Sequence, residues 1–194
     1  MRSFFDKTAQ TMAMLGGIVL TMLIVLTCVS VLGRGLNTLG HSDLMEGLLP
    51  SIANWLIGTG VGPVTGDFEL VQAGMAFTIF AFLPLCQLRA GHATVDIFSR
   101  RLPRRVNTYL TAFWEVALSC VIVLIAWRLS AGLAVKFGNG QTSFLLQFPI
   151  WWAYAASLVA AAIAALVGLF CAWQRLHNAL TGQNPLPHDE GRHI

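Results

Sequence analysis

The residues best suited to chemistry gather in one short segment of this 194-residue chain, immediately before a leucine–proline step. They are Arg89, Gly91, His92, Val95, Asp96 and Arg100. If the segment is helical, spacings of three and four residues bring the two arginines, the histidine and the aspartate onto one face. Such a helix would lie at a membrane surface and end near Pro103. Judged by chemistry alone, these polar groups cap the end of an apolar segment.

Glu115 is the second candidate, because it stands between Trp114 and Val116 inside a long apolar stretch. A carboxylate within a membrane is costly, so it is normally either partnered or functional. Three interpretations are open: a polar contact at a helix interface, a neutral protonated acid, or a part in ion coupling. We favour the polar contact, because a transport relay usually needs several such groups that face one another.

Metal, haem and disulfide chemistry find little support in the sequence. A disulfide oxidase or a zinc site needs paired cysteines, whereas the cysteines here fall one in each apolar stretch and form no C-x-x-C pair. A membrane haem needs histidines inside helices, and all five histidines lie outside the apolar stretches. These residues are Cys28, Cys86, Cys120 and Cys171, and His41, His92, His177, His188 and His193. We predict no catalytic residue, no metal site and no cofactor.

Four apolar stretches are each long enough to cross a bilayer, which requires about 20 helical residues. They cover about residues 12–32, 68–88, 106–129 and 148–173. The composition agrees, with 56% hydrophobic residues, 11% charged residues and a mean hydropathy of +0.67. Because peptide groups in lipid must be satisfied within the segment, each stretch is predicted to be a helix. The sequence therefore predicts an all-α integral membrane protein, with residues 1–194 in a single membrane domain.

The basic residues predict the orientation, since cytoplasmic loops carry an excess of lysine and arginine. Nine of the twelve lie in the N-terminal segment, the second loop and the tail 174–194. Arg34, in the first loop, and Arg128 and Lys136, assigned to the third, fall on the other side. Both termini are therefore expected in the cytoplasm. Nucleic acid is not an expected partner, because no soluble surface interleaves basic and aromatic residues.

The long first loop, residues 33–67, is expected in the periplasm and carries a second helical pattern. Asp43 and Glu46 have the spacing of a capping box, and apolar residues recur behind them up to Trp55. With Pro50 inside it, the pattern predicts a short kinked helix on the membrane surface. A plain loop is the alternative. A fifth span is disfavoured, because Glu46, Pro50 and several glycines interrupt the segment.

Small residues recur every four positions along the fourth stretch, and a second row runs beside the first. The first row is Ala156, Ala160, Ala164, Gly168 and Ala172. Small side chains let helix backbones approach closely, which drives association in lipid. We therefore expect this face, together with Glu115, to meet another helix of this chain or of a partner, although alanine is also simply common in membrane helices. Trp151, Trp152 and Trp55 are expected to anchor the chain at the membrane interface.

The segment from Arg89 resembles the R-x-x-H-x-x-V-D motif, with leucine–proline downstream, of the small permease subunit of tripartite ATP-independent periplasmic (TRAP) transporters, the DctQ-like or Q subunit. The resemblance extends from the first span to the fourth. It includes Glu69, which opens the second span, and Pro149 and Trp151 at the start of the fourth.

This resemblance implies a sodium symporter that imports organic acids such as C4-dicarboxylates across the bacterial inner membrane. A periplasmic substrate-binding protein would deliver the substrate, and a large M subunit would carry it by an elevator motion. The small multi-pass subunit would be a fixed scaffold among membrane lipids, and not an enzyme. Two other classes are weighed against this one: a self-sufficient small transporter or channel, and the membrane anchor of a redox enzyme.

Overall fold

The computed structural model describes residues 2–42, 62–89 and 104–181, with residues 47, 51, 55, 58 and 60 between them. Its helices are α1 (Arg2–Gly40), α4 (Asp67–Leu88), α6 (Arg104–Asn139) and α7 (Trp151–Thr181). All four are long and apolar enough to cross a membrane. In the described ranges the only non-helical pairing is an isolated antiparallel bridge between Thr142 and Pro149. The predicted all-helical fold with four spanning helices is confirmed.

Two helices are longer than the apolar stretches from which they were predicted. α1 continues to Gly40, so residues 33–40 belong to a helix rather than to the first loop. α6 continues to Asn139, and the residues assigned to the third loop, Arg128 and Lys136, instead lie on it. The expected surface helix falls mainly on residues 43–61, most of which lie outside the described part of the chain.

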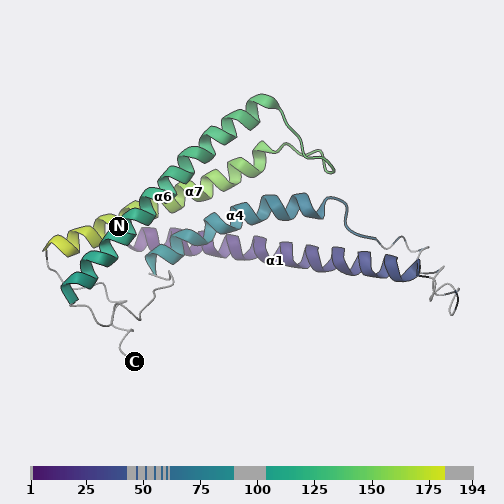
Figure 1. The fold of residues 1–194 in the computed structure, drawn as a ribbon, viewed down its shortest axis with the longest axis horizontal. Helices are drawn as coiled ribbons and strands as arrows, with labels where there is room; N and C mark the ends of the chain where they lie inside the picture. The colour runs from purple at the N-terminus through teal and green to yellow at the C-terminus, as the bar shows by residue number, and fades with distance from the viewer. Residues whose placement is uncertain are drawn as a thin grey trace.

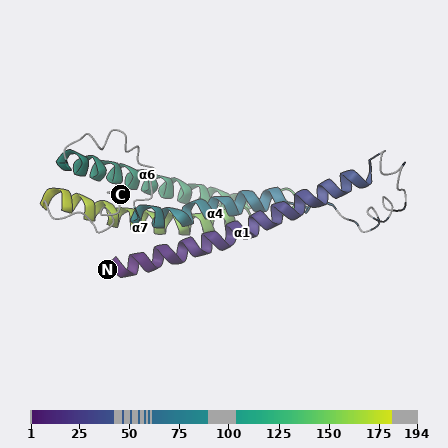
Figure 2. The ribbon, with the colours of Figure 1, turned by 90° about the horizontal axis from the view of Figure 1, so that it is seen from below.

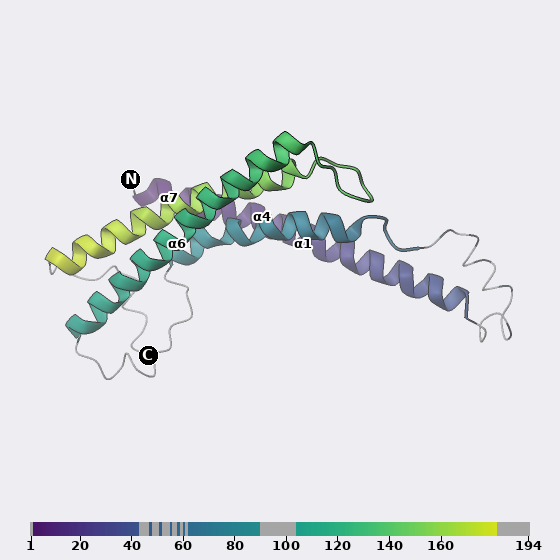
Figure 3. The same ribbon diagram turned by 45° about the horizontal axis from the view of Figure 1, so that its top comes forward.

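The helices lie in a row, in the order α1, α4, α7, α6 (Figure 1). α1 packs along α4, α4 packs against α7, and α7 packs along α6. The view from below shows α1 and α6 on opposite sides of the two central helices (Figure 2). The start of α1 and the end of α7 lie at one end of the molecule, away from the loop that joins α6 to α7 (Figure 3).

α7 is the central packing element. In its most apolar window 44% of the residues are buried, against 17% or less in the other three helices. One cluster joins Met12, Ala81 and Ala160 from three helices, and a second joins Ile122 to Ala164 and Ala165. The outer helices α1 and α6 leave many large apolar side chains exposed, as expected of a protein whose solvent is lipid.

The register of α6 against α7 follows from contacts along their whole length. The rings of Phe137 and Trp151 lie 5.4 Å apart, and Ser119 Oγ donates a hydrogen bond of 2.9 Å to the carbonyl of Gly168. Between these points Ile122 packs with Ala164 and Ala165. The two helices are therefore antiparallel, and the depth of any residue on α6 can be read from its neighbours on α7.

Candidate functional site: the helix interfaces

The small-residue rows of α7 are buried between α4 and α6. Ala160 and Ala164 have no exposed surface, and Ala172 is 7% exposed. Ala156 is the exception in the row, because it lies near the start of the helix and is exposed. In the neighbouring row Ser157, Ala161 and Ala165 are also buried. Of the two possibilities that the sequence left open, the structure shows this face packing against helices of the same chain.

Gly168 marks a close contact between α7 and α4. A Cβ added at this residue would lie 2.6 Å from Oε1 of Gln87, so no larger residue fits without displacing the amide. Gln87 is itself fully buried, and neither its amide nitrogen nor its oxygen finds a hydrogen-bond partner among the described residues. An unsatisfied buried polar group costs about 1–3 kcal/mol. Gln87 was not among the predicted site residues, because its only signal in the sequence is a polar side chain at the end of an apolar stretch.

Glu115 faces Arg175 across the interface of α6 and α7. Its Oε2 lies 3.6 Å from Nε of the arginine, and the side chains are 5% and 17% exposed. Sequence reasoning placed the glutamate near the middle of a span and the arginine in the tail. Because α7 continues to Thr181, Arg175 is helical and reaches the glutamate. The observed contact is of the kind that we favoured, a polar contact between helices.

Glu69 ties the α6–α7 connection to the first turn of α4. Its carboxylate accepts hydrogen bonds from the backbone N–H groups of Leu145, at 2.8 Å, and Leu146, at 3.0 Å. Leu146 also packs against Gly66, whose φ of 79° and lack of a side chain allow this close approach. The acidic residue that opens the second span thus fixes a loop more than seventy residues away.

Asp67 likewise joins α1 to the first turn of α4. It accepts a hydrogen bond from the hydroxyl of Ser30, and its Oδ2 lies 3.8 Å from the guanidinium of Arg34. Its other oxygen accepts the N–H of Phe68, at 2.7 Å, within the first turn of α4. A negative charge there also suits the positive end of the helix dipole. Two carboxylates in the first turn of α4, Asp67 and Glu69, therefore hold α1 and the α6–α7 loop to this end of the helix.

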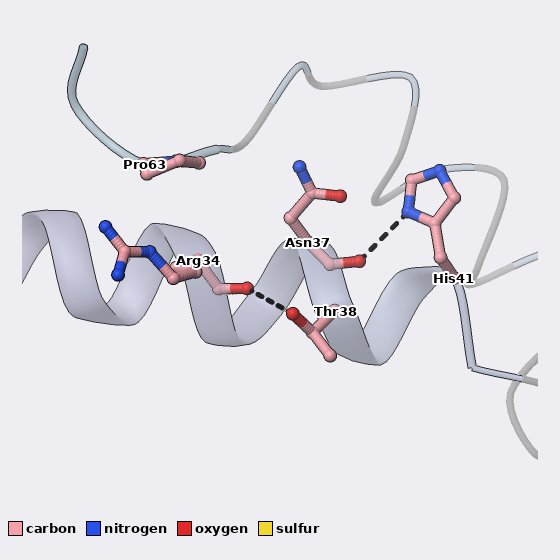
Figure 4. A pocket seen from close by; sticks show the side chains of 5 residues that line it. All are labelled: Arg34, Asn37, Thr38, His41 and Pro63. Atoms are coloured by element: carbon pink, nitrogen blue, oxygen red, sulfur yellow. Dashed lines mark hydrogen bonds between the residues drawn. The ribbon is translucent and has the colours of Figure 1, made fainter.

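An open groove of about 630 Å³ lies beside the last turns of α1. It is lined by Arg34, Asn37, Thr38, His41 and Pro63 (Figure 4). Thr38 donates to the carbonyl of Arg34, and His41 Nδ1 lies 3.0 Å from the carbonyl of Asn37. Because these polar groups bond to their own helix and Arg34 leans towards Asp67, the groove does not form a convergent ligand site.

The motif segment begins where α4 ends. Arg89 is the residue after the last helical one, is exposed, and donates its backbone N–H to the carbonyl of Leu85 at 3.1 Å. The other motif residues, Gly91, His92, Val95, Asp96 and Arg100, lie outside the described residues. Their expected helix and shared face stay predictions.

The three tryptophans expected at the membrane interface differ in how far they are buried. Trp151 is half-buried and packs edge-on against Phe137 and Trp152, whereas Trp152 and Trp55 are 58% and 68% exposed. Lys136, one residue before Phe137, reaches Oε1 of Gln141 at 2.6 Å. The expectation that these tryptophans anchor the chain at the membrane interface stays a prediction.

Arg128 was expected in a loop, and the structure places it within α6. It stands on α6, exposed, nine residues before Phe137 and nine after Ser119. Its guanidinium carbon lies 5.8 Å from the centroid of the Trp127 ring.

Comparison with known proteins identifies the family of the chain. A family model described as "Tripartite ATP-independent periplasmic transporters, DctQ component" matches residues 23–178. No curated protein and no solved structure gives a match. The matched range includes the second half of α1, all of α4 and α6, and most of α7. The chain therefore belongs to the DctQ family and is a small membrane subunit of a TRAP transporter.

Proposed function

We propose that this chain is the fixed scaffold on which a large, elevator-type permease subunit moves, in a sodium-driven importer of organic acids fed by a periplasmic binding protein. The row of helices is the observation that carries the proposal. In the described ranges the outermost helices α1 and α6 share no packed interface, so the four helices do not close around a central polar path. A flat wall with apolar faces is what a moving neighbour requires from a support.

The bracing of the row supports the same role. Glu69 holds the α6–α7 loop to α4, and Asp67 holds α1 to α4. At the other end Glu115 and Arg175 join α6 to α7. Contacts at both ends keep the four helices at fixed angles, which is the property a scaffold needs. With basic residues concentrated near the termini and in the second loop, both termini face the cytoplasm of a bacterial inner membrane.

Copurification tests the proposal. The tagged chain is expressed with its large permease subunit, extracted in mild detergent and purified, and the recovered large subunit is quantified. We expect a stable complex that survives extraction. As a control, an unrelated four-helix membrane protein with the same tag should recover none. If the chain is recovered alone from membranes that contain both subunits, the proposal is wrong.

A further inference from the structure

α4 indicates where one boundary of the membrane lies, because this helix has almost no length to spare. Its 22 residues extend about 33 Å at the α-helical rise, and the hydrocarbon core of a bilayer is about 30 Å thick. Any tilt would shorten the distance that the helix covers. Both ends of α4 must therefore lie close to the membrane boundaries, and the first turn, with Phe68 and Glu69, lies at one of them.

The tip of the α6–α7 loop, residues 144–146, lies beside this first turn. The carboxylate of Glu69 accepts the N–H groups of Leu145, at 2.8 Å, and Leu146, at 3.0 Å. Leu146 also packs against Gly66, the residue before α4. In Figure 3 the loop extends towards the start of α4. These contacts place the loop tip at the same membrane boundary as the start of α4.

The loop tip is apolar and exposed, in contrast to the polar segment that leads to it. Residues 140–143, which connect α6 to the tip, read Gly-Gln-Thr-Ser. Phe144 is 87% exposed and Leu145 is 54% exposed, and Phe68 in the first turn of α4 is 78% exposed. Large apolar side chains that gather on a surface mark a contact with a protein or with a membrane.

The backbone of the loop tip meets the condition for entering lipid, which is that its polar groups bond within the protein. Besides the two N–H groups held by Glu69, the carbonyl of Phe144 accepts a hydrogen bond from Nε2 of Gln147 at 2.9 Å. The N–H of Ser143 donates to the carbonyl of Phe148, also at 2.9 Å. Water would satisfy these groups outside the membrane and a partner protein could offer bonds of its own, whereas lipid tails can do neither. This arrangement favours lipid as the occupant.

We propose that the loop tip inserts into the membrane interface, with Phe144 and Leu145 among the lipids beside Phe68. Glu69 makes the insertion possible, because it satisfies two amides that would otherwise have to stay in water. The inserted tip would hold the α6–α7 hairpin at a constant depth relative to α4. The proposal goes beyond the scaffold function and does not depend on it, since the partner is lipid and not the large subunit.

The test reads the surroundings of the loop tip with an environment-sensitive fluorophore. The label is attached to Phe144→Cys, in a background without the four native cysteines, and the protein is reconstituted into phosphatidylcholine nanodiscs with and without the large subunit. The control label is at Asn139→Cys, on the exposed last residue of α6. We expect lipid with a nitroxide near the top of its acyl chain to quench the label at Phe144 about twofold or more over the label at Asn139. Iodide in the water should show the opposite preference.

The other outcomes would overturn the proposal. Stronger quenching by iodide than by lipid at Phe144 would place the loop tip in water. Protection from both quenchers once the large subunit or the binding protein is added would show that a protein covers the tip. Because Phe144 is exposed, Phe144→Cys should keep the melting temperature of the isolated chain. A lower melting temperature would show that the ring packs within the protein, and would contradict its place among lipids.

A matched pair of variants in the first turn of α4 tests the part assigned to Glu69. Glu69→Ala should lower the lipid quenching of the label at Phe144 by roughly twofold or more, because amides without an acceptor do not enter lipid. Asp67→Ala removes a carboxylate that bonds to Ser30 of α1 and not to the loop, so it should leave the quenching unchanged. Unchanged quenching in Glu69→Ala, or an equal fall in both variants, would overturn the assignment.

Discussion

Glu115 and Arg175 approach within 3.6 Å across the interface of α6 and α7, although the sequence places one inside a span and the other in a tail. The pair forms because α7 extends beyond its apolar stretch, so that Arg175 is part of the helix that packs against α6. It joins the two helices at the end where both run past α4, so its loss should loosen the α6–α7 hairpin.

Removing one member of this pair should therefore destabilise the protein. We expect Glu115→Gln and Arg175→Gln each to lower the free energy of unfolding by about 1–3 kcal/mol, because the remaining charge stays largely buried. The double variant should lose less than the sum of the two. Thermal unfolding in detergent measures this. Strict additivity would show that the two groups do not interact.

The same Glu115→Gln substitution separates structure from ion coupling. It keeps the shape and much of the hydrogen bonding of the side chain while removing its charge. In the assembled transporter we expect the dependence of uptake on sodium concentration to stay as in the wild type, with any loss appearing in assembly. An altered sodium dependence with normal assembly would place Glu115 in the coupling pathway.

The small-residue row offers a matched pair of substitutions. Ala164 is fully buried whereas Ala156, two turns earlier in the same row, is exposed. Ala164→Leu should force α7 away from its neighbours and destabilise the protein by about 1–3 kcal/mol. Ala156→Leu should change the melting temperature little. Equal effects of the two variants would mean that this face is not packed as described.

Gln87 should tolerate loss of its amide. Because neither polar atom has a partner in the described part of the chain, Gln87→Leu is expected to leave the melting temperature unchanged or to raise it. Ser119→Ala, which removes the hydrogen bond to Gly168, should lower it and is the control. A fall for Gln87→Leu as large as that for Ser119→Ala would reveal a partner for the amide.

The carboxylate of Glu69 should control the order of the α6–α7 loop. Glu69→Ala leaves the N–H groups of Leu145 and Leu146 without their acceptor, so hydrogen exchange at these two amides should accelerate. Exchange at Ile150, whose N–H bonds to the carbonyl of Gln141, serves as the internal reference. Unchanged exchange at Leu145 and Leu146 would show that the carboxylate of Glu69 does not hold this loop.

The orientation can be tested by labelling single cysteines in a background without the four native ones. Cysteines at Ser99 and Asn184 should react from the cytoplasmic side, and one at Ser51 from the periplasmic side. Reaction at Ser99 from the periplasm would reverse the proposed topology and the assignment of the second loop.

Much of the fold could be predicted from apolarity, because lipid imposes a length and a helical conformation on each span. The helix ends could not, since apolarity indicates where lipid lies and not where a helix stops. That is why Arg128 and Lys136 were assigned to a loop. The burial of Ala160 and Ala164 was foreseeable from spacing, whereas the partner of Glu115 depends on the register of two helices. The row arrangement, which no sequence period encodes, had to come from the structure.

Uptake by proteoliposomes tests the central claim most directly. Vesicles that contain this chain alone should show no sodium-dependent uptake of an organic acid, because the four described helices do not close around a path for it. Adding the large subunit and the loaded binding protein should restore uptake, and the large subunit without this chain should be impaired. Sodium-dependent uptake by this chain alone would contradict the scaffold account.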